Sequence, residues 1–511
     1  MPQSTMPQIE NVVMLMLENR SLDNLFGTLY TGPSHMTFYP KGSPQRFDGI
    51  PDGASNPAFD WWGNLRNYPV VPIPIQQLIN AGDDPSIIPW WDPTESYLSP
   101  FDTGHGVLNQ IFGNQNMVST EPPYGTPPTM LGFLQDYWTT ETTEAYGGMD
   151  ILWTFQSSQI PNLSTVARLG AISDAWFSSV PTQTNPNRAY SLIGTSCGRD
   201  ANQQLSAVEQ FEQPTIFNAL AQAGKACGLY FTDVWQQNQC FTQYTFPFLT
   251  DGCDEIANIS QFYTRARNGT LLPFTYLEPT WGYGISGSIE MTQGTDLHPP
   301  TSVTPGDQFV GNVIQHLVRS PQWKNTLLII TFDEHGGTYD HVRPPWGAIN
   351  PDGLVSDNGF DFNLFGVRVP TILMSPYVAP FTVFRAPAAS AYPFDHTSLI
   401  KTLLGWAGAD IGSAGFFARM PQAPAFDGVL HRDDTAAADN DAAIQGAFGN
   451  GPLPAPAGSK PPRTNNALFE GVSRASVRYI TATSRTPEQM LEKIAEYKRN
   501  PERFEASLER D

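Results

Sequence analysis

The chain has 511 residues, a formal net charge of −21 and a sequence pI of about 4.7. This acidic balance argues against nucleic acid as a partner and against electrostatic docking onto anionic membranes. Glycine and proline contribute 43 and 46 residues, while 40% of the chain is hydrophobic and 12% aromatic. The composition therefore indicates long ordered loops over a buried core, in one elaborate domain or two to three modest ones.

The first residues of the chain, MPQSTMPQ, contain neither a basic stretch nor an apolar core, so no secretory signal is visible. No run approaches the roughly 18 apolar residues that span a membrane. Three alternatives stay open: the protein remains inside the cell, its signal is absent from this sequence, or export uses a route that reads no such signal. The four cysteines lack zinc-type spacing. Cys240 and Cys253 could pair in an exported protein, and all four could equally be buried thiols.

The first apolar run is Ile9–Leu17, IENVVMLML. Apolar residues without polar alternation predict a strand buried on both faces of a parallel sheet. The run ends at Glu18 and Asn19. Because ligands bind at the carboxyl ends of strands in open α/β sheets, the acid and the amide are candidate ligand-binding groups. The alternative is that they cap the following helix.

Residues 31–130 are dominated by proline, glycine, asparagine and aromatic residues, with the pairs Trp61-Trp62 and Trp90-Trp91. Little of this segment has a helical or strand period. We interpret it as a loop-rich insertion that folds over one end of the sheet as a lid or cleft wall.

Two helices are predicted next. The first, within residues 150–174, has its expected cap at Asn162 or Ser164. The second begins near Thr184, which precedes Asn185-Pro186, and its first turn would offer free N–H groups to a phosphoryl group. If Thr184 also faces a metal ion, its hydroxyl can ionise and act as a nucleophile. The alternative is an N-cap threonine without a catalytic role.

The segment from Leu327 to His341, LLIITFDEHGGTYDH, organises the rest of the prediction. Its apolar run predicts a second buried strand, which stops at Asp333 and Glu334. Two carboxylates in a site of low dielectric repel each other, so a positive group, most naturally a divalent cation, is expected beside them. Gly336 and Gly337 allow a sharp turn and a close approach to a ligand. The alternative is again that the acids cap a helix.

Six segments in this order resemble motifs of the phosphoesterase family, which includes bacterial phosphatidylcholine-preferring phospholipases C, plant non-specific phospholipases C and acid phosphatases. Together they span residues 9–406. Residues 18–23 resemble its ENRSFD motif, residues 181–188 its P-x-x-[TS]-x-P-N-R motif and residues 331–341 its DEHGG-FYDH motif. The others are residues 296–300, 366–370 and 395–398.

The resemblance implies an α/β fold with an alkaline-phosphatase-like core, in which helices flank a central, mostly parallel sheet that carries long loop insertions. It implies that Thr184 is the nucleophile and also touches the metal. The other implied metal ligands are Glu18, Asn19, Asp333 and Glu334. Some relatives have two aspartates where this chain has Asp333-Glu334. Zinc or calcium is the expected cofactor, and magnesium and manganese remain open.

The resemblance also matches His298 and His341 to histidines that line the phosphate pocket, where they would bind phosphate oxygens or protonate the leaving alcohol. The further expected substrate-binding residues are Arg188, His335, Asp340, Asp395 and His396. Several of these residues could instead have a purely structural role. His298 would only hold its loop, Arg188 would only pair with carboxylates, and Asp395-His396 would only cap the helix at Leu399–Leu404.

The implied reaction is phospholipase C hydrolysis of phosphatidylcholine-like lipids to diacylglycerol and phosphocholine. Threonine at position 184 resembles the phospholipase branch of the family, whereas the acid phosphatases tend to have serine there. The aromatic residues of the insertion could form a cage for a quaternary ammonium group, and the alternative is ordinary packing. The alternatives are an acid phosphatase acting on monoesters and a non-catalytic binding protein on the same fold. The expected partners are a phospholipid or small phosphoester and, peripherally, a membrane, with export to the periplasm or the extracellular space.

We assign residues 1–430 to the catalytic domain and residues 431–511 to an irregular arm followed by a helix. The arm is residues 432–466, which are rich in alanine, aspartate, asparagine, glycine and proline. The helix starts near Thr486, which is followed by a proline and by apolar residues at helical spacing. It would pack on the domain or form an oligomer.

Overall fold

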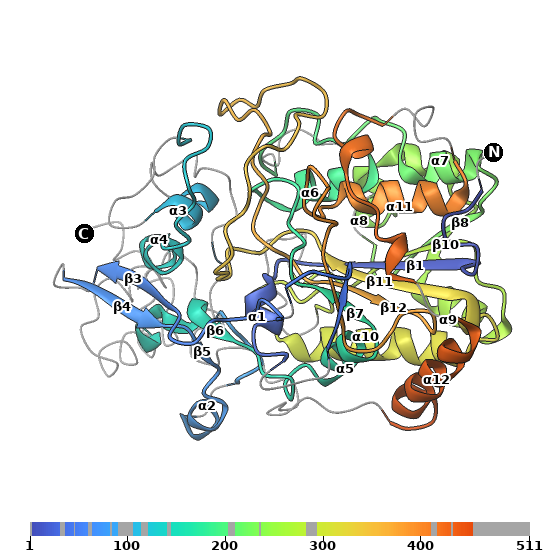
Figure 1. Ribbon diagram of the computed structural model, residues 1–511, viewed down its shortest axis with the longest axis horizontal. Coiled ribbons are helices and arrows are strands. Elements are labelled where there is room, and N and C mark those ends of the chain that lie inside the picture. Colours follow the sequence, from blue (N-terminus) through green and yellow to red (C-terminus); the bar gives the residue numbers. More distant parts are fainter. Residues whose placement is uncertain are drawn as a thin grey trace, which may run out of the picture.

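A nine-stranded sheet forms the centre of the molecule (Figure 1). Its strands, in spatial order, are β2 (Thr37–Tyr39), β13 (Thr382–Phe384), β7 (Ala171–Ser173), β12 (Thr371–Met374), β11 (Thr326–Phe332), β1 (Asn11–Leu17), β10 (Phe274–Glu278), β8 (Cys227–Phe231) and β9 (Glu255–Asn258). Only β12 pairs antiparallel with its neighbours in this sheet. The expected mostly parallel α/β sheet is therefore confirmed. The computed structural model describes residues 3–30, 36–44, 46–59, 64–81, 84–89, 93, 106–113, 121–140, 145–202, 210–234, 237–282, 294–409, 416–430 and 433–452.

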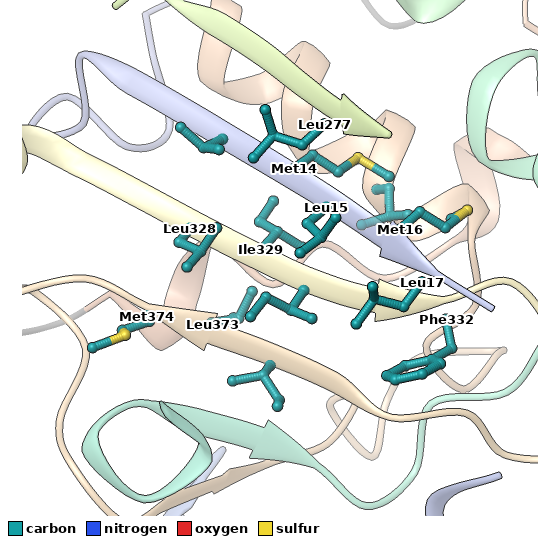
Figure 2. Packing of buried hydrophobic residues seen from close by; sticks show 14 of the residues in the cluster. Met14, Leu15, Met16, Leu17, Leu277, Leu328, Ile329, Phe332, Leu373 and Met374 are labelled. Atoms are coloured by element: carbon teal, nitrogen blue, oxygen red, sulfur yellow. The ribbon is translucent and has the colours of Figure 1, made fainter. Parts of the chain in front are cut away.

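The two strands expected from the apolar runs lie side by side in the middle of the sheet. Every residue of β1 and β11 is buried, and their side chains pack between the layers with those of β10 and β12 (Figure 2). The strands are parallel and in register, with Leu17 opposite Phe332. Because both strands end at the same level, the polar residues that follow them emerge together at the carboxyl ends of the central strands.

Helices cover both faces of the sheet (Figure 1). One layer contains α5 (Pro161–Leu169), α9 (Ile259–Asn268), α10 (Val303–Val318) and α12 (Asp434–Ile444); the other contains α6 (Thr184–Leu192), α7 (Ile216–Gln222), α8 (Phe241–Thr245) and α11 (Thr397–Ala407). The helix expected within residues 150–174 is present. Its predicted cap is wrong, because the helix begins at Pro161 with Ile160 as N-cap, ahead of Asn162.

The described parts of residues 31–130 contain more regular structure than the sequence suggested. They hold β2, the hairpin of β3 (Ser55–Phe59) and β4 (Leu65–Pro69), β5 (Val71–Pro72), α2 (Ile75–Ala81) and α3 (Val107–Phe112). β2 is an outer strand of the central sheet, whereas the other elements, together with α4 (Phe133–Thr140), lie toward the end of the sheet from which α1 (Leu22–Phe26) emerges after β1 (Figure 1). The pairs Trp61-Trp62 and Trp90-Trp91 lie outside the described residues.

The arm assigned to residues 432–466 is corrected over its first part. Residues 434–444 form α12, whose N-cap Asp433 accepts a hydrogen bond from the Ala436 N–H. The helix expected from Thr486 lies outside the described residues. All four cysteines are free thiols, so Cys240 and Cys253 are not joined. Within the part of the chain that the structure describes, no helix is both long and apolar enough to cross a membrane.

Candidate active site

The carboxyl ends of β1 and β11 deliver a cluster of buried polar side chains. Asp333 follows β11, and its Oδ1 accepts hydrogen bonds from the backbone N–H of Asn19 at 3.0 Å and of Glu334 at 2.7 Å. Asn19 adopts a left-handed conformation with φ 57°, and Glu18 beside it is 3% exposed. Neither residue caps α1, because the N-cap of that helix is Ser21, which accepts from the Asn24 N–H. The helix-cap alternative for Glu18 and Asn19 is therefore wrong.

The candidate nucleophile joins this cluster from a third element. Thr184 is the first residue of α6, and its Oγ1 donates to Glu18 Oε1 at 2.9 Å. The N-cap of α6 is Gln183, and the Gln183 side chain makes no capping hydrogen bond among the described residues. Asn187 holds the preceding loop, since its Nδ2 donates to the carbonyls of Val180 and Thr182. The local sequence thus aims the Thr184 hydroxyl at the strand edge instead of at its own helix.

Arg188, one turn further along α6, lies between the two acids. Its guanidinium pairs with Glu18 through Nη2 and with Asp333 through Nε at 3.2 Å. Trp281 covers it, with the guanidinium carbon 4.7 Å from the ring centroid. Burial raises the pKa of Glu18 well above its usual range, the Arg188 charge opposes that shift, and the charge of Asp333 adds to it. The expectation that Arg188 pairs with carboxylates is confirmed.

His298 reaches the cluster from the loop after β10. Its Nε2 lies 2.9 Å from Asn19 Nδ2, and its Nδ1 contacts the Pro299 carbonyl. A carbonyl only accepts, so the proton is assigned to Nδ1, and Nε2 accepts from the Asn19 amide. This bond fixes which end of the amide faces the imidazole and presents Oδ1 on the opposite side.

Glu334 and His335 point into the wall built by the insertion. Glu334 Oε2 accepts from the Gly336 N–H at 2.6 Å and lies 3.3 Å from His335 Nδ1. His335 Nε2 is 2.7 Å from Gln110 Oε1 on α3. Burial lowers the pKa of His335 to about 3, so the ring is neutral at physiological pH. Gln110 in turn donates to Asp136 on α4. These contacts place the insertion directly against the loop of Glu334.

Asp395 and His396 support the cluster from behind. His396 is the N-cap of α11, and its Nε2 lies 2.5 Å from the Asp333 backbone carbonyl. Burial lowers the pKa of His396, which keeps the ring neutral. Asp395 accepts from Ser179 at 2.8 Å and from Thr397 at 2.5 Å. Both residues therefore hold the strand end and the loop before Thr184, and their role in substrate binding remains a prediction.

His341 belongs to a second cluster, formed with Asp23, Asp48, Asp340 and Arg368. His341 Nδ1 lies 2.6 Å from Asp23, and its Nε2 lies 3.5 Å from Asp48. Arg368 contacts Asp23 at 3.0 Å and Asp340 at 2.9 Å. Burial lowers the pKa of His341, but the hydrogen bonds to Asp23 and Asp48 outweigh it and raise the pKa to about 10. The imidazole is therefore positively charged at neutral pH.

Ligand atoms of Asp23, Asp340 and His341 lie within 4.8 Å of one another, a spacing that suits a metal ion. Arg368, which is fully buried, already pairs with both of these carboxylates. The two buried carboxylates, Asp23 and Asp340, face a guanidinium and an imidazolium and are balanced in charge, while the third, Asp48, is 52% exposed to solvent. We therefore interpret the second cluster as an ion-pair network that fixes the loops after β1 and β11.

The first cluster holds more buried negative charge than the guanidinium of Arg188 balances. Three buried carboxylates, on Glu18, Asp333 and Glu334, lie at this strand edge, and Arg188 supplies one positive charge against the first two. Uncompensated buried carboxylates are costly, and a divalent cation would restore the balance. With Asn19 and Thr184 they offer oxygen donors, which hard divalent ions prefer.

Sheet and cluster together define an α/β protein with an acid-rich centre, a threonine hydroxyl and a helix terminus at the carboxyl ends of its central strands. Residues 9–405 match the Phosphoesterase family, and the chain belongs to that family. The protein is thus a phosphoric ester hydrolase.

The chain is similar to two phospholipases C in sequence, and it also aligns with one solved structure. The chain is 30% identical to non-specific phospholipase C4 of Arabidopsis thaliana over 408 residues, which is 77% of this chain and 67% of the relative. It is 25% identical to phospholipase C A of Mycobacterium tuberculosis over 433 residues, covering 77% and 72%. A solved protein of the alkaline phosphatase superfamily from Vibrio parahaemolyticus aligns over 50% of this chain and 62% of its own, with 14% identity and a TM-score of 0.31.

Several residues of the two clusters were not predicted from the sequence. Trp281, which covers Arg188, and Gln110, which binds His335, come from distant segments with no motif around them. Asp23 and Arg368 lay inside the motif segments at residues 18–23 and 366–370. Their buried positions identify them only once the loops are folded together.

Proposed function

We propose that the protein is a metal-dependent phospholipase C that hydrolyses phosphatidylcholine-like lipids to diacylglycerol and phosphocholine, with Thr184 as nucleophile. The observation that carries this proposal is the hydrogen bond from Thr184 Oγ1 to Glu18 Oε1, 2.9 Å long, at the first turn of a buried helix. The names of the relatives from Arabidopsis and Mycobacterium support the diester as substrate.

In the proposed reaction, the Thr184 oxygen attacks phosphorus as its proton passes toward Glu18, and the bond to the diacylglycerol oxygen breaks. The leaving oxygen takes up the proton that Glu18 received, and water then hydrolyses the phosphothreonine. His298 carries its proton on Nδ1, toward the Pro299 carbonyl, so we assign it the role of holding Asn19. Of the first-turn N–H groups of α6, that of Asn185 donates to Asn202 and Pro186 has none, so the Thr184 N–H is the one that would stabilise charge on the transferred phosphoryl group. Asn19, held by His298, and Asp333, held by Arg188, keep the oxygen donors in place.

Glu18, Asn19, Asp333 and Glu334 would hold the cation, with the Thr184 hydroxyl facing it. Zinc or calcium is proposed, and magnesium or manganese would suit the same oxygen donors. When bound, the ion supplies Lewis-acid chemistry: it lowers the pKa of the threonine hydroxyl and neutralises charge on the phosphoryl oxygens. We also propose that the protein is exported and meets its lipid at a membrane surface.

The test is a paired assay of p-nitrophenyl phosphorylcholine and p-nitrophenyl phosphate, before and after chelation, with wild type, Thr184→Ala and Thr184→Ser. Diester turnover should dominate, fall at least about 10³-fold in Thr184→Ala and be partly kept in Thr184→Ser, since serine retains the nucleophilic hydroxyl. Chelation should abolish turnover, and one specific divalent ion should restore it.

Three other results would contradict the proposal. Turnover mainly of the monoester would identify an acid phosphatase. Diester turnover that survives in Thr184→Ala would exclude Thr184 as the nucleophile. Absence of turnover with every divalent ion would favour a non-catalytic binding protein.

A further inference from the structure

Four exposed apolar side chains gather on two neighbouring loops. Tyr124, Ile349, Leu354 and Val355 are 67%, 38%, 49% and 56% exposed, and we call them the apolar rim. Three of them belong to the long loop between β11 and β12, which runs over the top of the molecule between α3 and α6 (Figure 1). Leaving several large apolar groups in water on adjacent loops is costly, which marks the surface as an interaction site.

The rim is held by its own contacts. The ring of Tyr124 packs edge-on against Trp346 with centroids 5.4 Å apart, and Trp346 Nε1 donates to the Thr126 carbonyl at 2.8 Å. Asn350 Nδ2 donates to the Leu354 carbonyl at 2.8 Å, which closes the turn that presents Leu354 and Val355. The rim is therefore a preformed surface and loses little conformational freedom when it is covered.

The same loop is tied to the segment of the candidate nucleophile. Ser356 Oγ and Asn358 Nδ2 donate to Asp200 Oδ2 at 2.6 and 2.9 Å. The backbone carbonyl of Asp200 accepts in turn from Thr182 Oγ1 at 2.5 Å, two residues before Thr184. These hydrogen bonds connect the residues that follow the rim with Thr182, in the loop that leads to the active-site threonine.

We propose that the apolar rim inserts into the surface of a zwitterionic phospholipid bilayer and seats the active site over the lipid headgroups. This inference rests on the proposed phospholipase C function. Thr184 is only 6% exposed, so a lipid must be raised from the bilayer to reach it, and a rim fixed to the same loops places the bilayer next to that route.

Charge decides which bilayer the rim fits. The loop carries the exposed Asp357 and Asp361 beside the rim, and the whole chain has a net charge of −21. Anionic lipid would be repelled, because binding to such surfaces needs basic side chains near the apolar groups. A zwitterionic surface leaves apolar insertion as the driving force.

The experiment compares wild type with Leu354→Asp/Val355→Asp and Leu354→Ser/Val355→Ser in sedimentation with phosphatidylcholine vesicles. Leu65→Asp is the matched control, since Leu65 is 40% exposed on β4, well apart from the rim (Figure 1). We expect both double variants to lose at least about tenfold in vesicle affinity, because each rim side chain contributes apolar burial. Turnover of vesicle lipid should fall in parallel. Turnover of p-nitrophenyl phosphorylcholine, and vesicle binding by Leu65→Asp, should stay at wild-type levels.

Retention of vesicle binding by the double variants would overturn the proposal, as would stronger binding of wild type to phosphatidylserine vesicles than to phosphatidylcholine. Self-association that the double variants abolish, without vesicle binding by wild type, would assign the rim to a second copy of the chain and also overturn it. The soluble diester separates the two proposals, because its turnover reports on the proposed function without requiring a bilayer.

Discussion

The loops after β1 and β11 build two buried clusters of charged residues that differ in one property. In the first, Glu18 and Asp333 share a single guanidinium, that of Arg188, with the buried Glu334 next in the chain. In the second, Asp23 and Asp340 face Arg368 and a histidine that is protonated at neutral pH. The first cluster is short of positive charge, and the second is balanced.

This difference in charge balance distinguishes the candidate catalytic cluster from the structural one. Both clusters contain acids and a histidine from sequence motifs, and both are buried, so residue type and burial do not separate them. Charge balance does, because a buried centre with surplus carboxylates must gain either a proton or an external cation, as the raised pKa of Glu18 indicates, whereas a balanced centre is complete as folded. The nucleophilic hydroxyl of Thr184 also points at the unbalanced cluster.

The largest expected effect comes from neutralising one acid in each cluster. Glu18→Gln should reduce metal binding and lower diester turnover at least about 10³-fold, because it removes the negative charge that would bind the ion and accept the Thr184 proton. Asp340→Asn should keep the metal and most of its turnover. Elemental analysis of desalted protein, with the diester assay, measures both. If Asp340→Asn lost metal and Glu18→Gln kept it, the two assignments would have to be exchanged.

The second effect concerns stability. Arg368→Met should lower the free energy of unfolding by about 3–5 kcal/mol, because it leaves Asp23 and Asp340 buried without their guanidinium. Arg265→Met is the control: its partner Glu255 is about a quarter exposed, and the loss should be within about 1 kcal/mol. Denaturant unfolding at neutral pH measures both. Equal losses in the two variants would contradict the structural role of the second cluster.

A smaller effect is expected at Gly336, which lies between the clusters. A Cβ there would meet the Asn19 carbonyl oxygen at 2.2 Å, and the residue has φ 61°. Gly336→Ala should therefore displace Asn19 and lower diester turnover about tenfold or more. Gly353→Ala separates strain from contact, since Gly353 has φ 77° but open space around it. That variant should lose about 1 kcal/mol of stability and keep its turnover. Unchanged turnover in Gly336→Ala would show that the position of Asn19 is not critical.

The sequence predicted the elements that create this arrangement. Two largely apolar runs, each followed by an acid, were sufficient to predict β1, β11 and the polar residues at their carboxyl ends. Their register, with Leu17 opposite Phe332, depends on pairing between strands more than 300 residues apart. Because the strands are so far apart in the chain, the motifs could suggest that Glu18 and Asp333 bind the same ligand, but the sequence could not predict the geometry of the pair.

The features that the sequence did not predict depend on contacts between residues distant in the chain. The start of α5 was misplaced because Asp307 of α10, not Asn162 or Ser164, accepts from its first-turn N–H groups. The division of the histidines between the clusters also depended on tertiary contacts. His298 turned toward Asn19, and His341 toward Asp23. By contrast, α12 had a local signal, an aspartate cap before an alanine-rich stretch, which the compositional interpretation overlooked.

The last effect, and the sharpest test of charge balance, is the pH dependence contributed by His341. Its pKa of about 10 in the folded state exceeds the unfolded value of roughly 6.5. Its stabilisation is therefore fully present below about pH 6.5 and is lost as the pH rises through 10. Asp23, Asp48, Asp340 and Arg368 face the ring. Burial raises the pKa of Asp340 to about 6 despite Arg368, so that carboxyl titrates below this window.

The difference in unfolding free energy between wild type and His341→Gln should accordingly be on the order of a few kcal/mol near pH 6.5 and shrink toward pH 10. Denaturant unfolding at pH 6.5, 8 and 10 would record it. The metal content of both proteins should stay equal across this range, because the histidine balances the second cluster only. A difference that stayed constant with pH would mean that the ring acts by packing alone. A loss of metal in His341→Gln would show that the two clusters are coupled, and that charge balance in one depends on the other.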